Sequence, residues 1–105
     1  MDVLYTDGSK SLLGVGCAVV APDGVIKKRL PSDSSVFMAE LLAVLTAVKC
    51  IFYNSSSSRN FTVFTDSMSV LSAIRNLFSS HHLVQEIQDW VYLLLNRRGF
   101  NIKFC

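Results

Sequence analysis

Residues 3–7, Val-Leu-Tyr-Thr-Asp, and residues 62–66, Thr-Val-Phe-Thr-Asp, carry one pattern at two distant places in the chain. In each, an apolar run of strand-forming side chains ends in Thr-Asp. If these two strands lie side by side and parallel, both carboxylates emerge at the same carboxyl edge of the sheet, where open α/β sheets place their ligands. The sequence therefore predicts that Asp7 and Asp66 face one site.

Each aspartate alone also has a structural explanation. Asp7 begins the polar run Asp-Gly-Ser-Lys over residues 7–10, which is typical of a turn closing a strand. Asp66 precedes a helical pattern and could cap that helix. Both explanations stay open at the level of the sequence.

The rest of the chain divides into further strands and helices. Pro22-Asp23-Gly24 is a strong turn signal between two apolar runs and predicts a hairpin, and Gly99 is a plausible stop for the last helix. We expect strands over residues 3–6, 14–21, 25–30, 61–65 and 100–105, helices over about 36–53, 66–77 and 83–96, and a polar connection over 54–60. This order predicts a mixed α/β layer fold with a central five-stranded sheet.

Composition bounds the class of protein. A length of 105 residues is that of one small domain, and 50% hydrophobic against 17% charged residues excludes intrinsic disorder. The net charge of +2 is too small for binding that rests on bulk attraction to nucleic acid. Three cysteines without a CxxC spacing indicate neither a disulfide framework nor a zinc module. With no signal-peptide pattern at the start, we expect an intracellular protein of the cytoplasm or nucleus.

Residues 36–53 are almost continuously apolar and long enough to raise the question of a membrane span. Glu40 and Lys49 argue against one, because each charge is costly in a bilayer, and a helix buried in a protein core fits better. Glu40 has no Lys or Arg within a helical turn, so its burial needs another partner, although a position near the helix start offers the helix dipole as an alternative. Three carboxylates without basic partners point to a divalent cation, Mg²⁺ or Mn²⁺.

Four motifs together resemble the type 1 ribonuclease H domain. They are residues 5–9 (YTDGS), 14–19 (GVGCAV), 39–44 (AELLAV) and 64–67 (FTDS). The resemblance implies a ribonuclease H-like mixed five-stranded sheet flanked by helices, and hydrolysis of the RNA strand of an RNA·DNA hybrid by two Mg²⁺ ions. It also implies that Asp7, Glu40 and Asp66 are catalytic and hold the metal, and that the RNA backbone is approached by Gly8, Ser9, Met38 and Ser67. Residues 80–105 are similar in style to the modules of non-LTR retroelement polyproteins, which implies a reverse transcriptase domain as a partner and no membrane.

The chain departs from the family pattern at its end. The family's fourth metal-binding Asp, its mobile His and its closing helix follow the fifth strand, and Cys105 lies on that strand. We therefore expect one domain over residues 1–105 that lacks the C-terminal helix, with activity that is weak, absent or dependent on further sequence. His81 and His82 precede the long helix and are expected to be a helix-start or exposed pair rather than the catalytic His.

Two other functions stay open. One is a non-catalytic module of the same fold that binds nucleic acid. The other is a receiver-like domain phosphorylated on Asp7 or Asp66, which the absence of a Gly-rich phosphate loop and of a matching switch Lys disfavours. The basic clusters at residues 27–29 and 97–98 are interpreted as ordinary solvated charge.

Overall fold

The computed structural model describes residues 2–53 and 59–105, so most of the polar connection predicted over residues 54–60 lies outside the described residues. The predicted order of elements is confirmed. The elements are β1 (Asp2–Ser11), β2 (Gly14–Ala21), β3 (Gly24–Leu30), α1 (Val36–Tyr53), β4 (Asn60–Thr65), α2 (Met68–Arg75), α3 (His82–Arg98) and β5 (Asn101–Phe104).

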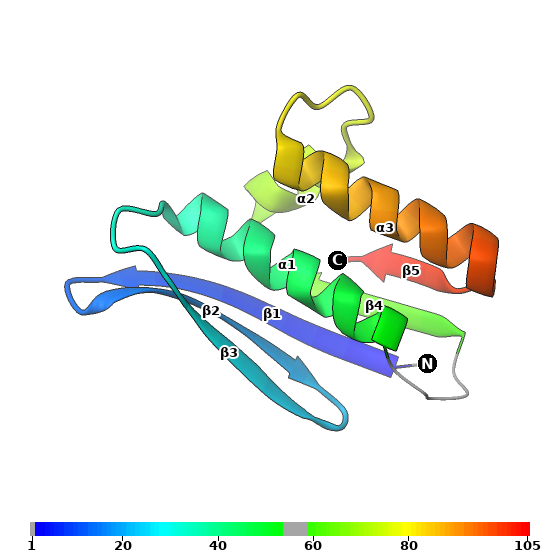
Figure 1. The fold of residues 1–105 in the computed structure, drawn as a ribbon, viewed down its shortest axis with the longest axis horizontal. Coiled ribbons are helices and arrows are strands. Elements are labelled where there is room, and N and C mark those ends of the chain that lie inside the picture. Colours follow the sequence, from blue (N-terminus) through cyan, green and yellow to red (C-terminus); the bar gives the residue numbers. More distant parts are fainter. Residues whose placement is uncertain (1, 54–58) are drawn as a thin grey trace.

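The strands form one mixed sheet in the order β3-β2-β1-β4-β5 (Figure 1). Strands β1, β2 and β3 are antiparallel neighbours, whereas β4 is parallel to both β1 and β5. The parallel pairing of β1 with β4 is the arrangement that the two Thr-Asp strand ends predicted. The central β1 therefore joins an antiparallel meander to a parallel pair.

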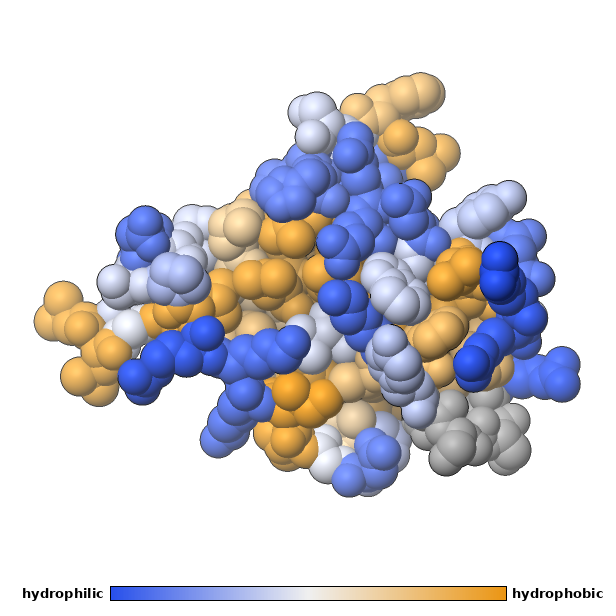
Figure 2. All heavy atoms as spheres, viewed as in Figure 1, coloured by the Kyte–Doolittle hydropathy of each residue, from blue (hydrophilic) through white to orange (hydrophobic). Residues whose placement is uncertain are grey.

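Strand β1 is longer than the sequence predicted. The run over residues 7–10, interpreted as a possible turn, continues the strand as far as Ser11 and pairs with β2 from Tyr5↔Val20 to Ser11↔Gly14. The prediction was wrong because it considered the polar run alone, and pairing with β2 satisfies its backbone groups in extended form. The turn is instead at the two residues Leu12 and Leu13, whose side chains are exposed. Figure 2 shows an apolar tip at the left, where Figure 1 has the β1–β2 turn.

One face of the sheet carries the hydrophobic core. Helix α1 packs across β1, β2 and β4, and all three helices contribute buried side chains to a single cluster with the sheet. In Figure 1, α1 lies along the sheet with α3 beside it. The strands supply this cluster with the fully or nearly buried side chains of Leu4, Val19, Phe61 and Val63. On the other face, alternate residues of β1, β2 and β4 are exposed, including Tyr5, Val20 and Phe64, and Val25 of β3 lies beside them.

The helix ends follow local chemistry. Ser67 is the N-cap of α2, and His81 is the N-cap of α3, where its Nδ1 accepts a hydrogen bond from the backbone N–H of Leu83 at 3.2 Å. Gly99 ends α3 in the left-handed conformation with φ of 65°. The helix-start position expected for His81 is therefore confirmed. Helix α2 ends at Arg75, two residues before the predicted end, and the Gln88 side-chain amide donates to the carbonyls of Ile74, in the last turn, and Asn76, the C-cap.

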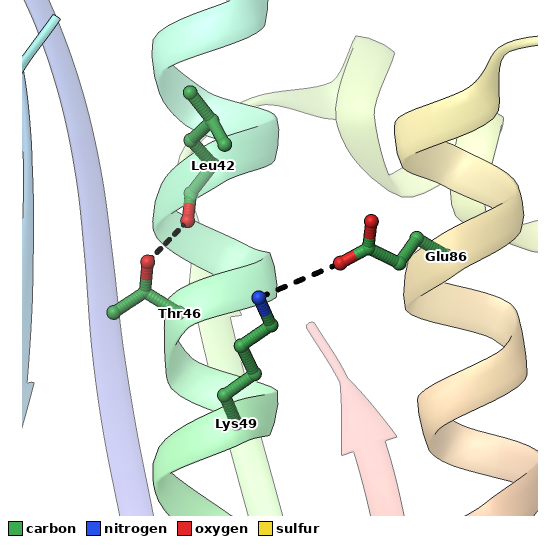
Figure 3. A network of polar contacts seen from close by, with 4 residues as sticks. All are labelled: Leu42, Thr46, Lys49 and Glu86. Carbon is green, nitrogen blue, oxygen red and sulfur yellow. Dashed lines mark hydrogen bonds and ion pairs between the residues drawn. The ribbon is translucent and has the colours of Figure 1, made fainter.

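Among the described residues, α1 is the one helix long and apolar enough to cross a membrane by length and composition, and half of that window is buried inside the fold. Two of its polar residues, Thr46 and Lys49, have partners within the protein (Figure 3). Lys49 Nζ lies 3.5 Å from Glu86 Oε2 on α3, and Thr46 Oγ1 donates to the Leu42 carbonyl at 2.7 Å. This burial is that of a central helix packed on a sheet.

Candidate functional site

The candidate site lies where β1 and β4 separate. Their parallel pairing ends at Thr6↔Thr65, so Asp7 and Asp66 are the next residue on each strand. Two threonines hold this point: Thr6 Oγ1 donates to the Phe64 carbonyl at 2.8 Å, and Thr65 Oγ1 accepts from the backbone N–H of Ser67 at 3.2 Å. The two aspartates therefore lie on adjacent strands at an edge of the sheet that these two hydrogen bonds stabilise.

The alternation of side chains assigns Asp7 to the face of the sheet without helices. Tyr5 and Phe64 are paired in register, and their rings stack at 5.3 Å between centroids on the exposed face. Asp7 is two residues beyond Tyr5 on β1 and so shares that face, while Leu4, Thr6 and Gly8 alternate toward α1. The side chain of Asp7 is exposed, as is that of Asp66.

Gly8 brings Glu40 to this edge from the opposite face. A Cβ on Gly8 would lie 2.5 Å from the Glu40 backbone nitrogen and 2.7 Å from Glu40 Cγ, distances too short for real Cβ contacts. The absence of a side chain at Gly8 thus allows α1 to approach β1 at Glu40, which is half-buried. Glu40 is consequently held beside the residue that follows Asp7.

The structural explanations considered for the three acids do not hold. Asp7 lies inside β1 rather than in a turn. Asp66 precedes the N-cap of α2, a role taken by Ser67, whose Oγ accepts from the Val70 N–H at 3.2 Å. Glu40 is the fifth residue of α1, outside the first turn in which the helix dipole acts. Among the described residues, none of the three acids forms an ion pair.

The donor chemistry fits a hard cation, but the side chains are not gathered around one. Carboxylate oxygens are the ligands that Mg²⁺ and Mn²⁺ prefer. Within residues 2–53 and 59–105, no group of three His, Cys, Asp or Glu side chains lies close enough to hold a metal ion. The backbone brings Asp7, Asp66 and Glu40 to one edge, and their role as metal ligands stays a prediction.

The other predicted site residues lie around the same edge. Ser9 is exposed on β1 on the same face as Asp7, and Met38 is half-buried in the first turn of α1, where its N–H donates to Ser35 Oγ. The Ser67 hydroxyl caps α2, and this contact explains its presence without a substrate. His81 and His82 stack on each other at the start of α3, and their expected non-catalytic role stays a prediction.

Two features of this region were not recognised in the sequence. Thr6 is buried and ties β1 to β4, although the pattern gave it only as strand-forming. A depression of about 260 Å³ on the exposed face runs from Asp7 and Ser9 to the basic strand β3. Its walls come from three strands, so only the pairing register reveals it.

The family model for RNase H matches residues 2–97. The chain belongs to the RNase H family. Two solved structures are similar to this RNase H-family domain, and each covers 99% of the chain. The RNase H1 of the halophilic archaeon Halobacterium salinarum NRC-1 has a TM-score of 0.63 and 16% sequence identity, with 83% of its own chain covered. A foamy viral protease-reverse transcriptase in complex with dsDNA has a TM-score of 0.70 and 24% identity, with 80% covered.

No curated protein matches the chain by sequence. At these identities the solved structures establish the fold of the RNase H-family domain and not its chemistry. The predicted α/β class, with its mixed five-stranded sheet and flanking helices, is confirmed. A retroelement context remains a prediction.

Proposed function

We propose that this RNase H-family domain hydrolyses the RNA strand of RNA·DNA hybrids by cutting within the strand. The observation that carries the proposal is that the backbone brings Asp7, Asp66 and Glu40 to one edge of the sheet, where none of them forms an ion pair among the described residues. Family membership supports the substrate class. Similarity to a protease-reverse transcriptase supports a setting beside a reverse transcriptase domain.

Asp7, Glu40 and Asp66 would hold Mg²⁺, with Mn²⁺ as the alternative. When bound, such a cation polarises the phosphodiester and lowers the pKa of coordinated water. The protein's own part is to present oxygens from two strand ends and one helix at a braced edge. Gly8, Ser9 and Met38 border this edge and are proposed to contact the RNA sugar–phosphate backbone, where the 2′-hydroxyl distinguishes RNA from DNA. Ser67 is a weaker contact because its hydroxyl already caps α2.

The test is cleavage of an RNA·DNA hybrid labelled on the RNA strand, in Mg²⁺ or Mn²⁺. We expect Asp7→Asn, Glu40→Gln and Asp66→Asn each to lower the cleavage rate by about 100-fold or more, since each removes a charge proposed to hold the cation. Asp89→Asn is the matched control, because Asp89 is an exposed carboxylate on α3 far along the chain from the three acids. It should cleave like the wild type.

The same series defines the contradictory result. Cleavage that survives all three substitutions would refute the assignment of the acids. Cleavage of the DNA strand at the same rate as the RNA strand would refute the assignment of the substrate. Circular dichroism of each variant shows whether a lost rate is a lost fold.

A second function is favoured by one observation, the absence of a metal-holding group of three side chains among the described residues. It is binding of hybrid or duplex without cutting. Under this alternative, the Asp7→Asn/Asp66→Asn double variant keeps the wild-type affinity for hybrid, and no metal supports turnover. Under the first proposal, the wild type cleaves hybrid in Mg²⁺ or Mn²⁺ and the double variant loses that cleavage.

A further inference from the structure

Strand β3 carries a basic cluster that the proposed chemistry does not use. Lys27, Lys28 and Arg29 are consecutive, all exposed, and account for three of the ten basic residues of the chain. Within the part of the chain that the structure describes, none of them forms an ion pair. The three cations therefore have unsatisfied charge at one edge of the sheet.

The register places two of these cations on the same face as Asp7. Asp7 pairs with Ala18, which pairs with Lys27, so the three form one row across β1, β2 and β3. The next row is Ser9, Gly16 and Arg29. At the usual spacing between strands, Lys27 and Asp7 are about 10 Å apart at their Cα atoms.

These two rows form a trough, with Asp7 and Ser9 on one side, Lys27 and Arg29 on the other, and Ala18 and Gly16 at its floor. In these two rows the middle strand contributes Ala18 and Gly16, a methyl group and a hydrogen, which are too small to fill the space between β1 and β3. The depression of about 260 Å³ lies here, and a second of about 310 Å³ shares Gly16 and Lys27 with it and continues past Arg29 to the β1–β2 turn. From the helix side, a band of hydrophilic side chains is also seen crossing the β2–β3 region beside the apolar tip (Figure 2).

We propose that this trough binds the phosphodiester backbone of the nucleic acid, with Lys27 and Arg29 as its phosphate contacts. The proposal rests on the proposed function and adds a positioning site beside its reacting edge. Exposed, unpaired Lys and Arg neutralise phosphates and release their counterions, which gives affinity without sequence preference. A floor of Gly and Ala lets the nucleic-acid backbone approach closely. Lys27 lies in the same row as Asp7, so a phosphate bound there is beside the proposed reacting edge. A small net charge of the whole chain is sufficient for binding, because these cations are concentrated where the nucleic acid is proposed to bind.

The competing explanation is that charges on an edge strand prevent pairing with another chain. The two explanations differ in whether these cations contribute to the salt dependence of nucleic-acid binding. The test is fluorescence anisotropy of a labelled RNA·DNA hybrid without divalent metal, over a series of salt concentrations. For Lys27→Gln/Arg29→Gln we expect Kd to weaken by about tenfold and the slope of log K against log salt to fall by about 2.

The matched control is Arg59→Gln/Lys103→Gln, which removes the same charge from exposed positions away from the trough. It should leave the slope within about 0.5 of the wild type, because neither residue is a proposed phosphate contact. An equal loss of slope in the control, or an unchanged slope in the trough variant, overturns the proposal. Size-exclusion chromatography detects the competing role, since association of the trough variant with an unchanged slope assigns these charges to edge protection.

The outcomes separate this inference from the proposed function. Cleavage of hybrid by the wild type with an unchanged slope in the trough variant refutes the trough alone. A reduced slope measured equally on hybrid and duplex DNA, with no cleavage, supports the trough and refutes the hybrid nuclease. Failure of the wild type to bind either nucleic acid refutes both.

Discussion

The two faces of the sheet use the same strands for different purposes, and β4 shows the contrast best. Phe61 is 2% exposed and packs in the core under the helices, whereas Phe64, three residues later, is 37% exposed and stacks on Tyr5 at the other face. The helix face holds the buried apolar side chains that stabilise the fold. The opposite face presents Asp7, Ser9, Lys27 and Arg29. The alternation of side chains along each strand thus places the stabilising core on one face and the proposed chemistry on the other. Gly8 connects the two, because it follows Asp7 and lies against Glu40 of α1.

The largest effect should come from removing the core ring of β4. We expect Phe61→Ala to lower the free energy of unfolding by about 3–5 kcal/mol, because it empties a filled site in the core. Phe64→Ala should cost about 1 kcal/mol, since its ring is partly in water and loses one stacking partner. Urea unfolding followed by circular dichroism measures both. Equal losses would show that the exposed face contributes as much to stability as the core.

The next effect tests the contact between the faces. Gly8→Ala should destabilise by about 1–3 kcal/mol, because its Cβ meets backbone atoms of Ala39 and Glu40 and α1 must shift. Gly16→Ala is the matched control on the neighbouring strand, where the nearest atom is the Lys28 carbonyl oxygen at 3.1 Å. Its loss in melting temperature should be clearly smaller. A harmless Gly8→Ala would contradict the close approach of Glu40 to β1.

A smaller effect distinguishes the cap from the acid before it. Ser67→Ala should cost about 1 kcal/mol, since the Val70 N–H at the start of α2 loses its acceptor. Asp66→Asn should change stability by less than about 0.5 kcal/mol, because Asp66 is exposed and does not cap the helix. Thermal unfolding of the two variants gives the comparison. A larger loss for Asp66→Asn would return Asp66 to a structural role.

The smallest effect concerns the ion pair between the helices. Lys49 and Glu86 side chains are 41% and 43% exposed, so solvent screens their attraction. A double-mutant cycle of Lys49→Met and Glu86→Gln should give a coupling of about 0.5 kcal/mol that falls as salt is added. A coupling above 2 kcal/mol would mean that the helix layer depends on this pair and not only on its apolar contacts.

Much of the fold was predictable because its signals are local. Pro22-Asp23-Gly24 fixes a turn, Gly99 ends α3, and the apolar pattern of residues 36–53 specifies the central helix whatever surrounds it. The candidate acids were also predictable, because Thr-Asp at two strand ends and a lone Glu in an apolar helix are visible without coordinates. The end of β1 was not predictable in this way. A polar run forms a turn or a strand according to whether a partner pairs with it, and here β2 does so.

The sequence by itself thus determined the order of the elements and singled out the three candidate acids, since propensity, turn chemistry and charge act within a few residues. Tertiary structure alone decided which strands are neighbours and which residues lie beside each acid. The parallel register of β1 and β4 brings Asp7 next to Asp66, the missing side chain of Gly8 admits Glu40, and the antiparallel rows align Lys27 with Asp7. Such neighbours come from residues far apart in the chain, and a shift of one residue in register would turn each of them to the other face.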